Sequence, residues 1–292
     1  MTFQALMLQV VAGLASGGIY ASLALALVMI YQATHLVNFA QGELAMFATY
    51  IAWSLMNAGL GYWPAFFLTV AIAFVLGILI ERIVIRPVEN APVLAVVVVF
   101  IGLLVILNSL AGWIFTYTIK SFPSPFPEKL PFGIHIISPH QLGAIGVTIV
   151  VLLLLYGFFR FTPLGLAMRA AAQNPASSRL VGIRVGWMLA LGWGLAAAVG
   201  AVAGMMVAPI VYLDPNMMSG TLLYAFAAAL LGGIDSPGGA VVGGLILGVL
   251  ENVLGAFVIG NELKLAVALV VIVAVLLVRP SGLFGRVHVS RV

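Results

Sequence analysis

Charged residues are scarce in this chain, and cysteine is absent. Only 7% of the 292 residues are charged and 64% are hydrophobic, whereas charged residues make up about 25% of a soluble globular protein. Because no segment has a soluble composition, the sequence excludes a soluble enzyme and an appended catalytic domain. The absence of cysteine excludes a disulfide framework and thiolate metal sites, and it leaves the redox compartment open.

The common motifs of catalysis and cofactor binding are also missing. No G-x-x-x-x-G-K-[ST] sequence occurs, so the chain cannot itself bind ATP through a P-loop. The four histidines show no metal-ligand spacing, and G-x-S-x-G is absent; these histidines are His35, His135, His140 and His288. We therefore expect no enzymatic activity, no metal and no cofactor.

Long apolar runs are abundant instead. Runs of roughly 18 to 25 residues, each able to cross a hydrocarbon core of about 30 Å, recur along the whole chain. They are continuous rather than alternating, which excludes a transmembrane β-barrel. The N-terminus lacks a basic region and a cleavage site, and we interpret it as the start of the first span. The predicted spans are 6–31, 41–58, 63–85, 92–114, 140–160, 187–212 and 262–279, with a discontinuous or re-entrant helical hairpin near 220–258.

These spans predict an all-α polytopic membrane protein with about eight spans and a single transmembrane domain over residues 1–292. Nine arginines and three lysines orient it, because positive residues favour the cytoplasmic side. The loop at about 161–186 is then cytoplasmic, and the loop at about 115–139 is periplasmic. The N-terminus lies outside and the C-terminus inside. The net charge of +4 forms no dense patch and does not indicate nucleic-acid binding.

The stretch LVNFAQGELAMF, residues 36–47, carries polar groups between two apolar runs. Asn38 and Gln41 have the spacing of a capping box, and Glu43 would lie in the first turns of a helix, where negative charge is favourable. One interpretation is a capped start of the second span at the cytoplasmic face. The other is a gate at the inner mouth of a pathway, formed by Asn38, Gln41, Gly42 and Glu43.

The turn GGIDSPGG, residues 232–239, contains a second helix start. Ser236 and Pro237 are suited to the N-cap and the first helical position, and Asp235 would lie beside the positive helix end. The residues therefore predict either a capped hairpin turn or a half-helix end that faces a translocation path.

Glycines four residues apart occur in two of the predicted spanning segments. This spacing places small residues on one helix face and lets backbones approach closely. It favours packing inside one subunit, with a subunit interface or a pore wall as the alternative. The pairs are Gly200 with Gly204, Gly239 with Gly243, and Gly244 with Gly248.

The predicted cytoplasmic loop, FTPLGLAMRAAAQNPASSRLVGIRVG, is too apolar to contact water alone. Asn174 followed by Pro175 predicts the start of a short helix. Leu180, Val181 and Ile183 then favour docking of a soluble partner over a merely solvated loop.

Acidic residues within the predicted spans are few: Glu43, Glu81 and Glu251. An ionisable group in a span indicates a functional site by default. Glu81 stands next to Arg82 at a span end, which is typical of an interfacial charge. Since no cationic residue is available within the spans, we expect neither a buried salt bridge nor a proton relay at the other two.

Three stretches together resemble one family, the LivH-type permease subunit of branched-chain amino-acid ABC importers. They are GLASGGIYASLALALVMIYQATHLVNFAQGELAMFATY (13–50), RAAAQNPASSRLVGIRV (169–185) and AFAAALLGGIDSPGGAVVGGLILGVLE (225–251). The resemblance implies a bacterial inner-membrane importer of leucine, isoleucine and valine. It also implies a second, LivM-type permease subunit, two cytoplasmic ABC ATPases and a periplasmic substrate-binding protein.

The second stretch matches the loop that contacts the ATPase in this family. The positions carried over are Arg169, Asn174, Pro175, Arg179, Leu180, Gly182 and Ile183. Where the family often has an acidic residue after Asn-Pro, this chain has NPASSR, with Ser177 and Ser178. This departure leaves the polarity of the contact open, though not its position.

Two alternatives to this function stay open at the level of sequence. Relatives of the family carry urea, short amides or other small organic solutes. An ion-coupled secondary transporter would instead use Glu43 or Asp235 as its coupling carboxylate. A purely structural membrane scaffold has no positive feature in the sequence.

Overall fold

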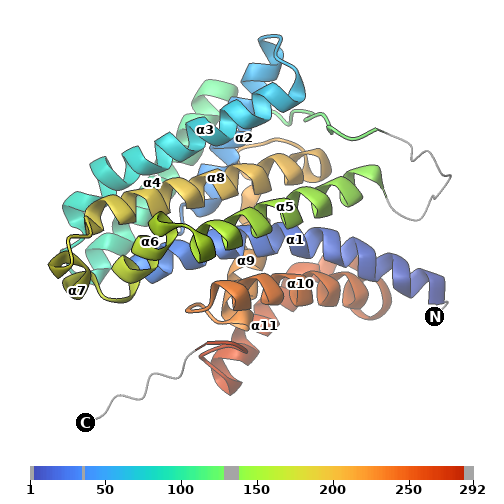
Figure 1. Cartoon of the computed structure of the whole chain (residues 1–292). Coiled ribbons are helices and arrows are strands. Elements are labelled where there is room, and N and C mark those ends of the chain that lie inside the picture. Colours follow the sequence, from blue (N-terminus) through green and yellow to red (C-terminus); the bar gives the residue numbers. More distant parts are fainter. Residues whose placement is uncertain (1–2, 35–36, 128–137, 286–292) are drawn as a thin grey trace. The chain divides into compact units, whose positions relative to one another are not determined.

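The structure is a computed structural model that describes residues 3–34, 37–127 and 138–285 (Figure 1). Some residues discussed above lie outside the described residues, among them part of the predicted 115–139 loop. They include His35, His135 and His288.

The described chain is built from helices, and its only strand-like pairing is one antiparallel bridge between Lys120 and Leu213. The longer helices are α1 (Phe3–Thr34), α3 (Tyr62–Ile80), α4 (Val93–Phe115), α5 (Pro139–Phe161), α8 (Val185–Val211) and α10 (Pro237–Leu254). The shorter ones are α2 (Gln41–Asn57), α6 (Pro163–Gln173), α7 (Pro175–Leu180), α9 (Met218–Gly232) and α11 (Lys264–Val278).

Seven helical segments of the described chain have the length and apolar composition to cross a membrane. Three of them extend beyond an α-helix through short π- and 3-10-helical turns, as where α3 continues to Val88. The prediction of an all-α polytopic membrane protein is confirmed, and the predicted spans agree with the helices to within a few residues. The predicted hairpin near 220–258 corresponds to α9 and α10.

The chain divides into two compact units. One contains residues 1–28, 126–148 and 220–292, and the other contains residues 29–125 and 149–219. Helices α1 and α5 therefore contribute residues to both.

In the first unit, glycines bring α1 and α10 into backbone contact. A Cβ atom at Gly244 would lie 2.5 Å from the Ala21 nitrogen, and one at Gly17 would lie 2.8 Å from the Gly244 carbonyl oxygen. Further toward the start of α1, a Cβ at Gly13 would lie 2.6 Å from Val249 Cα. Real Cβ atoms do not approach so closely, so only glycine permits this packing of two antiparallel helices.

The α9–α10 hairpin is closed by hydrogen bonds at its turn. Ser236 Oγ accepts from the Gly239 N–H at 3.1 Å and caps α10, as its position before Pro237 predicts. The segment after α11 packs on the same turn: Leu283 N–H donates to Leu231 O at 2.8 Å, and Phe284 N–H donates to Gly232 O at 2.9 Å. These bonds satisfy carbonyl groups that the end of α9 leaves without helical partners.

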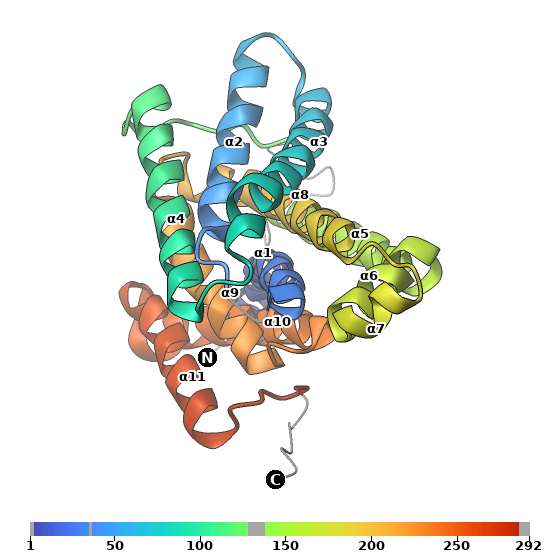
Figure 2. The same cartoon turned by 90° about the vertical axis from the view of Figure 1, so that its left-hand side faces the viewer.

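In the second unit, α2 lies among α3, α4 and α8 (Figure 2). Trp193 of α8 is fully buried and stacks on Phe100 of α4 with ring centroids 5.9 Å apart. A Cβ at Gly200 would lie 2.7 Å from Gln41 Nε2, and one at Gly204 would lie 2.7 Å from Ala45 O. Small residues on α8 therefore allow α2 to run parallel to it in direct contact.

We predict that Gly244→Ala destabilises the protein by about 1–3 kcal/mol, because the added methyl group meets Ala21 backbone atoms that cannot move alone. Gly102→Ala is the matched control, since a Cβ there meets no atom within 4 Å. The thermal unfolding midpoint in detergent measures both. Equal midpoints for the two variants would contradict the close α1–α10 contact.

Candidate functional site

The start of α2 is the most polar buried segment of the second unit. Asn38 Oδ1 accepts from the Ala40 N–H at 3.0 Å, and Asn38 Nδ2 donates to Gln41 Oε1 at 3.3 Å. The predicted capping box is wrong in detail. Ala40 is the N-cap and Gln41 is the first helical residue rather than the third. The Gln41 amide is engaged elsewhere, because its Nε2 donates to Ala196 O at 2.9 Å.

That contact places the start of α2 beside the middle of a spanning helix. Ala196 is the twelfth of the 27 residues that begin with Val185 in α8, about 17 Å along its axis at 1.5 Å per residue. The start of α2 therefore lies beside the middle of α8 and not beside its first residue, Val185. Non-helical backbone is tolerated at such depth when protein surrounds it, and Asn38, Ala40 and Gln41 are fully buried.

Glu43 joins α2 to two other segments through Asn108. Asn108 Nδ2, on α4, lies 3.4 Å from Glu43 Oε2, 2.8 Å from Pro215 O and 3.2 Å from Asn216 Oδ1. Glu43 is 7% exposed, and no lysine or arginine of the described residues forms an ion pair with it. The arrangement thus holds a nearly buried carboxylate among amides. We call Asn38, Gln41, Glu43, Asn108 and Asn216 the α2-start cluster.

Sequence reasoning missed Asn108 and Asn216. A signal existed for Asn108, which is the only amide in the 23-residue apolar helix VLAVVVVFIGLLVILNSLAGWIF. Asn216 gave a weaker signal, because it lies in the polar connection after α8, where asparagine is common.

Asp235, Ser236 and Pro237 lie in the first unit, in the turn between α9 and α10. Ser236 is the N-cap of α10 and Pro237 its first residue. The capped hairpin turn is thus present. The α2-start cluster, by contrast, belongs to the second unit.

Glu251 is a second buried acid, on α10 in the first unit. It lies close to Tyr20 and Tyr224, whose rings stack 4.8 Å apart, and its Oε2 atom has no hydrogen-bond partner in the described chain. Lys264, the first residue of α11, is a cation near this carboxyl group, and it donates to the neighbouring Asn252 Oδ1 at 3.2 Å. No ion pair joins Lys264 to Glu251 in the described chain.

Glu81 is buried and pairs with Arg86 rather than with its neighbour Arg82. Their charged atoms lie 3.1 Å apart, and Arg86 also donates to the Gly186 carbonyl oxygen. The segment Glu81–Ile85 is π-helical, and π-helical geometry relates residues five positions apart. The charge that the sequence predicts is therefore one half of an ion pair with Arg86, whose side chain is 31% exposed.

The 161–186 loop forms two capped helices. Thr162 Oγ1 accepts from the Gly165 N–H at 3.0 Å at the start of α6, and Asn174 Oδ1 accepts from the Ser177 N–H at 2.9 Å at the start of α7. Leu180 and Val181 are 88% and 76% exposed. The loop therefore presents two large apolar side chains at the end of α7.

The other residues predicted for docking fall in the same loop. Asn174, Pro175 and Arg179 are exposed, whereas Arg169 and Ile183 are half-buried. Gly182 has a φ of 84°, a conformation that favours glycine.

Comparison with known proteins adds sequence evidence. The family model described as branched-chain amino acid transport system / permease component matches residues 9–276. The high-affinity branched-chain amino acid transport system permease protein BraD of Pseudomonas aeruginosa is 33% identical over 97% of each chain. The corresponding permease protein LivH of Escherichia coli (strain K12) is 32% identical over 96% of each chain.

Comparison with solved structures supports the fold. PsaBC from Streptococcus pneumoniae, solved in complex with Fab, aligns with 92% of this chain and 91% of its own. The TM-score is 0.51 at 14% sequence identity, so this likeness concerns the fold alone.

We predict that Asn38→Ala lowers the free energy of unfolding by about 1–3 kcal/mol, because it leaves buried polar groups of Ala40 and Gln41 without their partner. Asn57→Ala, at the exposed end of the same helix, should change it by less than about 0.5 kcal/mol. Thermal unfolding in detergent compares the two. An Asn38→Ala variant as stable as Asn57→Ala would show that these bonds do not hold the start of α2.

Proposed function

Because the chain belongs to the branched-chain amino acid transport permease family, we propose that it is the membrane-spanning subunit of an ABC importer for leucine, isoleucine and valine. The observation that carries this proposal is the family match over nearly the whole length of an all-helical, multi-pass chain. The chain is a permease and not an enzyme, and ATP hydrolysis belongs to separate subunits.

The α2-start cluster is our proposed lining of the translocation pathway. Discontinuous helices that begin at membrane depth form the substrate sites of many transporters, and α2 begins beside the middle of α8. An intramembrane carboxylate without a cationic partner also indicates function. Asn38, Gln41, Gly42 and Glu43 would border the path, with Asn108 holding the carboxylate. Amide and carboxylate groups suit the charged ends of an amino acid, and the aliphatic side chains around them suit its apolar part.

The α9–α10 turn is a second proposed pathway element. Asp235, Ser236 and Pro237 would border the path at the cytoplasmic end, if the N-terminus lies outside and the C-terminus inside, as the arginine distribution favours. Support comes from the bonds that hold the turn in place, from Ser236 on one side and from Leu283 and Phe284 on the other.

The end of α7 and its flanks are the proposed ATPase-docking surface. This surface consists of Arg169, Asn174, Pro175, Arg179, Leu180, Gly182 and Ile183. Exposed Leu180 would insert into an apolar recess of the ATPase, as an anchor residue does in a helix–groove contact. The remaining partners would be a LivM-type second permease subunit and a periplasmic binding protein. The complex would lie in the bacterial inner membrane.

Glu43→Gln is expected to leave assembly intact and to lower uptake about tenfold. The amide still accepts a hydrogen bond from Asn108, but the negative charge is lost, and a change of about 1.4 kcal/mol in the barrier corresponds to tenfold. ATP-driven leucine uptake into proteoliposomes that contain the whole importer measures this. The exposed Glu262→Gln serves as the control for loss of one carboxylate.

Two outcomes would count against this function. Loss of assembly in Glu43→Gln would make the residue a structural one. Uptake by this chain alone, without ATP and abolished by an ionophore, would indicate an ion-coupled transporter.

Leu180→Asp is expected to weaken ATPase binding at least about tenfold, because docking would bury a charge in an apolar contact. Ser177→Asp, exposed on the same short helix, adds the same charge where a helix start favours it and should bind normally. Co-purification of the ATPase with the permease gives the readout. Equal binding by both variants would place the docking surface elsewhere.

A further inference from the structure

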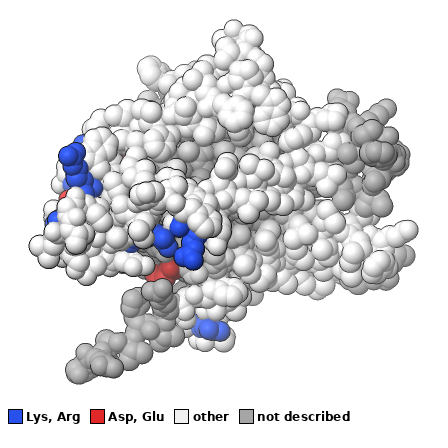
Figure 3. Space-filling model, in the orientation of Figure 1, with Lys and Arg blue, Asp and Glu red and all other residues white. Residues whose placement is uncertain are grey.

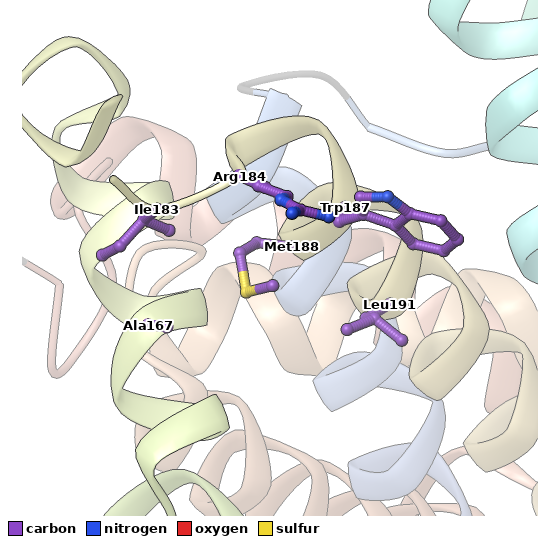
Figure 4. A pocket seen from close by; sticks show the side chains of 6 residues that line it. All are labelled: Ala167, Ile183, Arg184, Trp187, Met188 and Leu191. Carbon is purple, nitrogen blue, oxygen red and sulfur yellow. The ribbon is translucent and has the colours of Figure 1, made fainter. Parts of the chain in front are cut away.

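A hollow of about 400 Å³ lies between α6 and the first turns of α8 (Figure 4). Its lining is apolar except for one arginine and contains no acidic residue. Figure 4 shows the Arg184 side chain extending toward Trp187, with Met188 and Leu191 below them. The lining residues are Ala167, Ile183, Arg184, Trp187, Met188 and Leu191.

The hollow lies at the end of a spanning helix, where a membrane surface is expected. Arg184 is the N-cap of α8 and Trp187 lies in its first turn, and Trp187 is 45% exposed. Tryptophan at such a position is typical of the headgroup level of a bilayer. Beside it, α6 exposes Leu164 and Leu166, as a helix lying in the membrane surface does.

Basic side chains gather beside this hollow. The Arg82 guanidinium lies 3.7 Å from the centre of the Trp187 ring, and its Nε and Nη2 atoms are buried with no hydrogen-bond partner in the described chain. The nearest carboxylate in sequence, Glu81, is already paired with Arg86. The N-terminus of α8 adds a partial positive charge.

Exposed charge of this kind is rare on the protein surface. In the view of Figure 3 almost all of the surface is uncharged, and basic side chains form only a few small groups. A site that combines a guanidinium group, an interfacial tryptophan and an apolar wall matches one class of ligand. Basic pockets between helices at the membrane surface bind anionic lipid headgroups.

We propose that this hollow binds one anionic phospholipid, whose phosphate pairs with Arg184 and whose glycerol and first acyl carbons lie on Met188 and Leu191. Arg82 holds the Trp187 ring in place and adds to the positive field. Arginine suits this role because its planar fork matches phosphate oxygens. The inference goes beyond the proposed transport function, although Ile183 at the edge of the hollow also belongs to the proposed ATPase-docking surface.

Native mass spectrometry of the full-length chain, purified with its copurifying subunits and washed free of lipid, tests the proposal. Phosphatidylglycerol should bind at one site at least about tenfold more tightly than phosphatidylcholine with the same acyl chains. Arg184→Gln should weaken phosphatidylglycerol binding about tenfold, as expected for loss of one charge-assisted hydrogen bond. Arg184→Lys should retain most of it, and Ala167→Phe should reduce it by filling the hollow.

The controls distinguish a built lipid site from general charge attraction, from a free-phosphate site and from a protein contact. Arg279→Gln removes an equally exposed arginine at the end of α11 and should bind as the unmodified chain does. A loss as large as that of Arg184→Gln would indicate general attraction and overturn the proposal. Displacement by millimolar inorganic phosphate would overturn it in favour of a phosphate site. Binding by the chain alone that disappears when the ATPase is present would overturn it too, because protein would then cover the hollow.

Discussion

Inside a bilayer every backbone N–H and C=O group needs a partner within the protein, and this requirement underlies the structure. Helices satisfy it along their length, so the informative places are those where a helix begins or ends at depth. The start of α2 is such a place. Asn38 supplies the bond to Ala40, and Gln41 reaches Ala196 on α8. The end of α9 meets the same requirement, because the N–H groups of Leu283 and Phe284, from the far end of the described chain, donate to its carbonyl groups.

Close helix contact meets a second requirement of the same environment. Lipid tails are as apolar as leucine, so spanning helices gain little from hydrophobic burial and depend on packing and hydrogen bonds. Glycines on α1 and α10, and on α8 against α2, allow backbone contacts that any side chain would prevent. Glu43 lies on α2 and Glu251 on α10, so both carboxyl groups are carried by helices that make these close contacts. A carboxylate on such a helix is available for function only where its partners leave it a free side, and Glu43 borders the exposed Asn216.

Membership in the branched-chain amino acid permease family gives these features a common meaning. A permease needs a polar path through an apolar body and a contact for the subunit that supplies energy. The α2-start cluster is our candidate for the first, and the exposed end of α7 for the second. The hollow beside Arg184 lies next to the same loop. The α2-start cluster, the docking surface and the hollow all belong to the second unit, whereas the α9–α10 turn belongs to the first.

The sequence by itself determined the class of protein, the helices and several of their starts. Apolar run length, the Ser236-Pro237 and Asn174-Pro175 pairs and the apolar residues around Leu180 act locally, and the structure has the helices where these signals predict them. The resemblance to the permease family could also be recognised from the sequence.

Tertiary structure alone decided which polar groups meet. Gln41 and Ala196 are 155 positions apart, Asn108 joins Glu43 to Asn216, and Lys264 reaches Asn252. Such pairs depend on how separate helices pack, which no local pattern encodes. For that reason the start of α2 reads from sequence as a helix cap at a membrane face, whereas packing against α8 places it beside the middle of a spanning helix.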